Sequence, residues 1–174
     1  MNQAAYDAVE QAWTLTVKAR ALCPYTDDSA VGIEGYQSPS WYRQHGAVYF
    51  VNLAQPLKRE DVRELNEIGV FINRSFVISM AAILEALDVV PYGQSPDRSK
   101  AGGDHAQLTK WLRHRFAHGR WEFDKADRHH LETRALLEAL FPAGATKGTG
   151  FVISIDEILE PLKDGVLEYI RACA

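Results

Sequence analysis

Cysteine is scarce in this sequence, and the pattern that would build a disulfide framework or a zinc site is missing. The 174 residues include two cysteines, Cys23 and Cys173, which lie near opposite ends and belong to no C-x-x-C pair. Disulfide-stapled domains and structural zinc sites need several closely spaced cysteines or histidines. We therefore expect two reduced thiols in a cytoplasmic protein.

Long hydrophobic runs and an extreme charge are missing as well. The longest apolar stretch, 76–84, is interrupted by Ser79 and is too short to span a membrane. The start, MNQAAYDAVEQAW, has no basic segment followed by an apolar one, so we expect no signal peptide. The net charge of -4 argues against a polybasic membrane binder or a general nucleic-acid coat, but leaves room for one local basic site.

The motifs of several large enzyme classes are absent too. The chain has no P-loop, no G-x-S-x-G, no G-x-G-x-x-G and no H-E-x-x-H. We therefore predict neither a cofactor nor a metal.

Helical periodicity is what the sequence does contain. The apolar fraction of 47% and the charged fraction of 24% are typical of globular proteins, and the length suits one domain, 1–174. Capping-box pairs, Asp104 with Gln107 and Ser154 with Glu157, predict two helix starts. Pro161 is expected to kink the last helix. We predict an all-α, single-domain bundle of about five helices with one possible short strand. The predicted helices are 2–22, 57–87, 104–118, 124–141 and 154–170, and the possible strand is 47–53.

The segment 57–87 carries apolar residues on more than one side, which indicates a central helix or one that packs against a partner chain. Arg74 and Glu85 lie at nearly the same azimuth on this predicted helix. They form either a solvated edge of the helix or a pair that supports a site.

Basic residues and histidines gather in 98–134, which holds nine Lys+Arg against five Asp+Glu and five of the six histidines. This pattern suggests a site for an anionic ligand, although chance clustering on a solvated face would look the same.

Within the segment 98–134, the motif Arg113-His114-x-x-x-His118 ends a predicted helix just before Gly119, a natural helix-stop residue. At about 100° per residue, Arg113 lies on one side of the core direction and both histidines on the other. Arg113 and the histidines could therefore act on one substrate only if it lies across a groove between them, or if a second copy of the chain supplies further groups.

These residues resemble the R-[N/D/H]-x-x-x-H motif of HEPN domains, a helical family with many metal-independent ribonucleases, and Ala117-His118-Gly119 resembles the close of that motif. The likeness extends more weakly to the helices from about 57 to the end. It implies an endoribonuclease, a toxin or defence component, that cleaves RNA at the interface of a homodimer and has a nucleotidyltransferase-like antitoxin partner. The segment 24–53 has no counterpart in the family.

The resemblance also implies residue roles, which suit the chemistry. His118 would transfer a proton and Arg113 would hold the scissile phosphate, because imidazole titrates near neutrality and guanidinium binds phosphate oxygens through two parallel donors. His114 would orient one of them or bind phosphate, a role that the family usually gives to Asn or Asp. Three further cations would attract the RNA backbone: Lys110, Arg115 and Arg120.

Three other interpretations stay open at this point. His114 and His118, four residues apart, could bind zinc, but the sequence offers no obvious third ligand. Arg113 could simply pair with a carboxylate while His118 ends the helix. The chain could also be a HEPN-like module that binds a nucleotide or a protein without cleaving anything.

Overall fold

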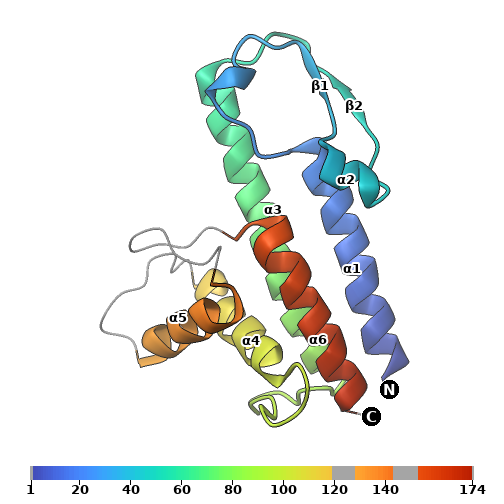
Figure 1. The fold of residues 1–174 in the computed structure, drawn as a ribbon, viewed down its shortest axis with the longest axis vertical. Coiled ribbons are helices and arrows are strands. Elements are labelled where there is room, and N and C mark those ends of the chain that lie inside the picture. The colour runs from blue at the N-terminus through green and yellow to red at the C-terminus, as the bar shows by residue number, and fades with distance from the viewer. Residues whose placement is uncertain (1, 119–127, 143–152, 174) are drawn as a thin grey trace. The chain divides into compact units, whose positions relative to one another are not determined.

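A computed structural model describes residues 2–118, 128–142 and 153–173 of the chain (Figure 1). It is mostly helical, with 66% of residues in helices and 4% in strands, which confirms the all-α prediction. The elements of the described residues are α1 (Gln3–Leu22), η1 (Asp28–Ala30), β1 (Gly35–Gln37), α2 (Ser40–Gln44), β2 (Phe50–Asn52), α3 (Arg59–Ala86), α4 (Gly103–Ala117), α5 (Arg128–Leu140), η2 (Ile155–Leu159) and α6 (Glu160–Ala172).

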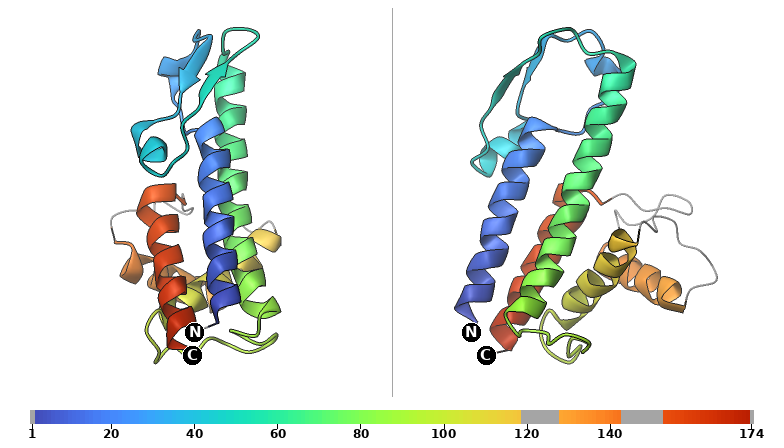
Figure 2. Two further views of the ribbon diagram at one scale, coloured as in Figure 1. Left: turned by 90° about the vertical axis from the view of Figure 1, so that its right-hand side faces the viewer. Right: turned by 180° about the vertical axis from the view of Figure 1, so that it is seen from behind.

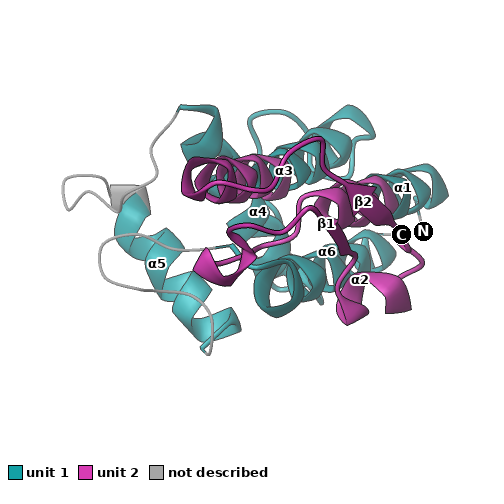
Figure 3. Cartoon of the chain, turned by 90° about the horizontal axis from the view of Figure 1, so that it is seen from above, with its two compact units in different colours: residues 1–12, 74–174 teal, residues 13–73 magenta. Residues whose placement is uncertain are grey.

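The chain divides into two compact units, which Figure 3 shows in teal and magenta. Unit 1 comprises Met1–Ala12 and Arg74–Ala174, and unit 2 comprises Trp13–Asn73. The long helices α1 and α3 each contribute one half to each unit.

Unit 1 is built around α4, which packs against α5 and α6 (Figure 1 and Figure 2). Leu108, Leu112 and Phe116 recur every four residues on α4 and are all buried, which is the apolar stripe that a core-facing helix needs. Trp111, on the same helix, is half-buried. The buried apolar stripe of α4 therefore sets the rotation of the helix about its axis, and with it the directions in which Arg113 and His118 project.

Glycine permits the close approach between α6 and the start of α4. A Cβ built at Gly165 would lie 2.1 Å from Cγ of His105, and one built at Gly102 would lie 2.0 Å from the backbone oxygen of Gly165. The pKa of His105 is lowered by burial, partly offset by the charges of Glu168 and Asp104. The His105 ring therefore fills the space that the missing side chain of Gly165 leaves open.

Unit 2 holds the strand predicted at 47–53, and here the structure adds what the sequence pattern did not reveal. The strand β2 is shorter than predicted and pairs with β1, antiparallel, with Tyr36 opposite Val51. We did not predict β1, since its three residues include a glycine and show no apolar alternation. Around this hairpin, a small apolar cluster contains Ala30, Leu57 and Val62, with Ile33, Leu53 and Leu65 against it.

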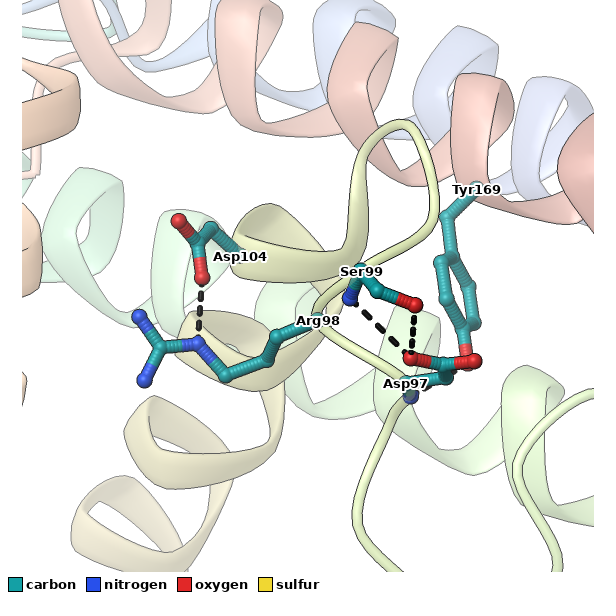
Figure 4. A network of polar contacts seen from close by, with 5 residues as sticks. All are labelled: Asp97, Arg98, Ser99, Asp104 and Tyr169. Atoms are coloured by element: carbon teal, nitrogen blue, oxygen red, sulfur yellow. Dashed lines mark hydrogen bonds and ion pairs between the residues drawn. The ribbon is translucent and has the colours of Figure 1, made fainter.

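The two helix starts predicted from capping boxes differ in outcome. Gly102, in the left-handed conformation with φ 72°, is the N-cap of α4, whereas Asp104 lies inside the first turn and pairs with Arg98 (Figure 4). Ser154 is an N-cap as predicted, but it opens the π-helical turn η2, in which the Leu159 N–H donates to the Ser154 carbonyl at 3.0 Å. Pro161 falls in the first turn of α6, and η2 leads into this turn without a break, because Leu159 and Glu160 are both in the right-handed helical conformation.

The helix α3 corrects our estimate of hydrophobic length. By length and composition it could cross a membrane, and 39% of its most apolar window is buried. Most of the charged residues of α3 lie before residue 68, so the apolar part of the helix is longer than the run 76–84 from which we judged its length. Core helices of soluble proteins have the same length and composition.

Candidate functional site

The predicted motif lies at the C-terminal end of α4. The helix ends at Ala117, and His118 is its C-cap, with a backbone N–H that donates to the Arg115 carbonyl at 3.3 Å. The predicted stop residue, Gly119, lies outside the described residues. His118 therefore occupies the helix-end position expected for the motif, which the purely structural interpretation also predicted.

His114 and His118 form an exposed pair of imidazoles. Their ring centroids are 4.5 Å apart and their planes make an angle of 61°. Because the two residues are one helical turn apart, α4 itself sets this geometry. Two accessible rings in contact can hold and exchange protons with a substrate that binds over them.

Arg113 points away from the histidines and is held by a carboxylate on α3. Its Nη1 lies 2.5 Å from Oε1 of Glu85, and the two side chains are 32% and 17% exposed. A charge-assisted hydrogen bond in such a half-buried position restricts the guanidinium more than a surface ion pair would. Arg113 is thus fixed in orientation, and one edge of its guanidinium is occupied.

Glu85 is the site residue that the sequence signalled only in part. We noted that it shares an azimuth with Arg74 on α3, either as a solvated edge or as a pair that supports a site. The Arg74 guanidinium lies over the Phe116 ring, 5.7 Å from its centroid, and burial lowers the pKa of Arg74. Both residues of α3 therefore support the end of α4, one through Arg113 and the other through Phe116.

Arg115 does not suit the RNA-binding role that we predicted for it. It is 4% exposed, and its Nη2 lies 2.8 Å from Nδ1 of His130 on α5. Since an arginine can only donate, His130 accepts on Nδ1 and carries any single ring proton on Nε2. The helical period explains the difference, because Arg115 lies close to the azimuth of Leu108 and Leu112.

Lys110, another of the predicted cations, lies near the Arg113–Glu85 pair. Its Nζ donates to the backbone oxygen of Gln94, in the loop before α4. Lys110 and Glu85 also line one small hollow of about 10 Å³, with Pro96 on its rim. Arg120, the third predicted cation, lies outside the described residues.

Within the described ranges, no group of three or more His, Cys, Asp or Glu side chains is arranged to hold a metal ion. The histidine pair on α4 thus has no third protein ligand in the part of the chain that the structure describes, and a zinc site there would be incomplete. What the described geometry offers is proton transfer by imidazole and charge stabilisation by guanidinium.

Three comparisons with known proteins found no match: no protein-family model, no curated protein and no solved structure is significantly similar to this chain.

Proposed function

We propose that this chain is a metal-independent endoribonuclease of the HEPN type, with Arg113, His114 and His118 as its catalytic residues. The observation that carries the proposal is the end of α4. There, two exposed imidazoles lie in contact, and an arginine of the same motif is oriented by a carboxylate.

The proposed reaction uses the 2′-hydroxyl of the RNA as the nucleophile. As it attacks the adjacent phosphorus, its proton passes to a base, and the departing 5′-oxygen takes up a proton from an acid. His118 transfers one of these protons, while His114 orients it or binds a phosphate oxygen. The Arg113 guanidinium stabilises the negative charge that builds up on the phosphate oxygens.

A second function is favoured by one specific observation. The Arg113 charge is already paired with Glu85, which suits a residue that holds the fold or a nucleotide rather than a transition state. The protein would then be a binding module without catalysis. The two functions differ in one experiment: purified protein incubated with RNA in EDTA cleaves the RNA under the first proposal and leaves it intact under the second.

Glu85→Gln is expected to lower the cleavage rate constant about 10- to 100-fold, because the amide keeps the shape of Glu85 but loses the charge that fixes Arg113. The Michaelis constant should change little, and the free energy of unfolding should fall by only about 1 kcal/mol. Steady-state kinetics and urea denaturation measure the two effects. Glu138→Gln, which breaks the exposed Arg134–Glu138 pair on α5, is the matched control. Equal rates for Glu85→Gln and the parent would exclude a positioning role for Glu85.

We further propose that the active form is a homodimer. Arg113 and His118 diverge on α4, so a second copy could complete each site about a two-fold axis. On α3, Ile68 and Phe71 are 46% and 70% exposed, a large apolar surface for a helix of this length.

Phe71→Glu is expected to shift the protein to monomers. An isologous interface buries the substituted residue twice, at about 1.5–3 kcal/mol for each phenylalanine, so the dissociation constant should rise at least about 100-fold. Light scattering at tens of micromolar measures the mass. Tyr92→Glu changes another aromatic residue, 87% exposed in the loop after α3, and should leave the dimer intact. A parent protein that is strictly monomeric would contradict the proposal.

A further inference from the structure

An apolar cavity of about 180 Å³ lies within unit 2. Tyr36 and Gln37 of β1 line it, together with Tyr25 from the chain after α1 and Leu65 of α3. Among the described residues that line it, none carries a charge and none belongs to the site proposed above. Since an apolar cavity of about 150 Å³ holds a benzene ring, this one has room for one side chain of the size of leucine or phenylalanine.

The strand β1, which lines this cavity, has an open edge. Next to the paired residues, the Ser38 N–H donates to the Tyr49 oxygen at 2.9 Å. Bonded and non-bonded pairs alternate along antiparallel strands, so Tyr36 is bonded to β2, and the backbone groups of Gly35 and Gln37 point away from β2. Within the ranges that the structure describes, no hydrogen bond occupies these outward N–H and C=O groups. Another extended chain can therefore pair with β1.

Side chains fix the chain segment that forms one wall of the cavity. Asn66 of α3 accepts from the Thr26 N–H at 3.0 Å through Oδ1 and donates to the Thr26 oxygen at 2.7 Å through Nδ2. The Tyr36 hydroxyl donates to the Leu22 oxygen at 2.5 Å. A cavity whose wall is already held in this way needs little ordering when a ligand enters it, so less binding free energy is lost.

The strand edge and the cavity together specify the kind of molecule that fits them. An open strand edge is satisfied by the backbone of another extended chain, with a bond to every second residue. The cavity holds one side chain and is too small for an element of a folded domain. Its uncharged lining favours an uncharged side chain, because a buried charge without a partner is costly. An extended peptide segment with one apolar side chain meets all of these conditions.

We propose that unit 2 binds an extended segment of a partner protein, which pairs with the open edge of β1 and inserts one apolar side chain into the cavity. Hydrogen bonds to the backbone of Gly35 and Gln37 provide affinity, and the cavity selects the side chain. Tyr25, which is 73% exposed, offers the inserted group an accessible aromatic ring. The protein would thus recruit its partner through unit 2, away from the motif on α4.

Selection from a displayed library of random peptides, with the full-length protein as the target, tests the proposal. The enriched peptides should share one apolar residue, such as Leu, Ile, Met or Phe, with uncharged residues on both sides. In a synthetic copy of an enriched peptide, changing this residue to Ala should raise the dissociation constant at least about tenfold, because a buried apolar side chain is lost. N-methylation of one backbone amide that pairs with β1 should raise it about two- to tenfold. Fluorescence anisotropy measures both effects.

Two proline variants form a matched pair, because strand edges tolerate proline where the N–H faces solvent. Gln37→Pro removes an outward N–H of β1 and should weaken peptide binding about two- to tenfold. Asn52→Pro removes an outward N–H from β2, at the opposite edge of the hairpin, and should bind like the parent. Tyr25→Ala changes an exposed residue of the cavity lining and should also weaken binding. Circular dichroism verifies that the variants fold.

Three results would overturn the proposal. The selection could enrich no sequence, or the enriched peptides could bind Gln37→Pro and Tyr25→Ala as tightly as the parent. The mass of the protein by light scattering could also fall on Gln37→Pro, which would make a second copy of this chain the occupant of the edge. None of these measurements involves RNA or the end of α4, so their outcome is independent of the proposed function.

Discussion

His118→Ala is expected to lower the rate constant for RNA cleavage by about 10²–10⁴-fold, the range typical of losing a general acid–base residue. Binding of RNA should change little, because an exposed imidazole at the end of α4 contributes mainly to proton transfer. Single-turnover cleavage and equilibrium binding, measured on the same RNA, separate the two quantities. The fold should be intact, since His118 is exposed and follows the last residue of α4.

Two other variants give this experiment its controls. His45→Ala removes another exposed histidine, whose ring stacks on Trp41 in unit 2, and should not change the cleavage rate. Lys110→Gln should show the opposite pattern to His118→Ala. It should weaken RNA binding and lower the salt dependence by a slope of about one, with cleavage of bound RNA nearly unchanged. A His118→Ala protein that cleaves as fast as the parent would remove His118 from the mechanism.

Gly165→Ala is expected to destabilise the fold by about 1–3 kcal/mol, as overpacking does in a close-packed interior. The sign is informative, because replacing glycine by alanine inside a helix ordinarily stabilises it by about 0.5–1 kcal/mol. Here the added Cβ would lie 2.1 Å from Cγ of His105, an atom near the base of its side chain that cannot swing away. Urea denaturation of the parent and the variant measures the difference.

The double variant His105→Ala, Gly165→Ala is the control. Removing the imidazole opens space for the new methyl group, so the second substitution should cost much less in this background than in the parent. If Gly165→Ala is as stable as the parent, α6 and the start of α4 do not approach as closely as described. The packing that presents the end of α4 would then need revision.

Much of the helical fold could be predicted from the sequence, because long apolar stripes leave little freedom. The expected helices 2–22 and 57–87 are α1 and α3 within two residues at each end. The hairpin of unit 2 was predicted only in its second strand. Strands of three residues carry too little periodicity, and pairing between β1 and β2 is set by partners rather than by local preference.

Helix starts were harder to predict than helix interiors. The capping-box pattern at Asp104 led us two residues too far along the chain, because a glycine in the left-handed conformation can open a helix without any side-chain cap. The same glycine is also needed for the close approach to Gly165. Tertiary packing, which a local pattern does not include, therefore decided where α4 begins.

For the candidate site, the motif gave the right helix end but not the partners of its side chains. Arg113 and His118 lie on different sides of α4, as about 100° per residue requires. That Glu85 would pair with Arg113, and that Arg74 would lie over Phe116, depended on how α3 and α4 pack, which no spacing within one helix reveals. Arg115 was assigned by its charge, although its azimuth on α4 matched the buried stripe.

Cleavage in EDTA of one RNA and of its 2′-O-methyl counterpart tests most directly whether the end of α4 uses the 2′-hydroxyl of RNA as its nucleophile. Both substrates are given to the parent protein and to His118→Ala. We expect the parent to cut only the unmodified RNA, to leave 2′,3′-cyclic phosphate ends, and to lose this activity when His118 is replaced. If the folded parent cuts neither substrate, or if the blocked RNA is cut equally well, the site at the end of α4 does not perform the proposed reaction.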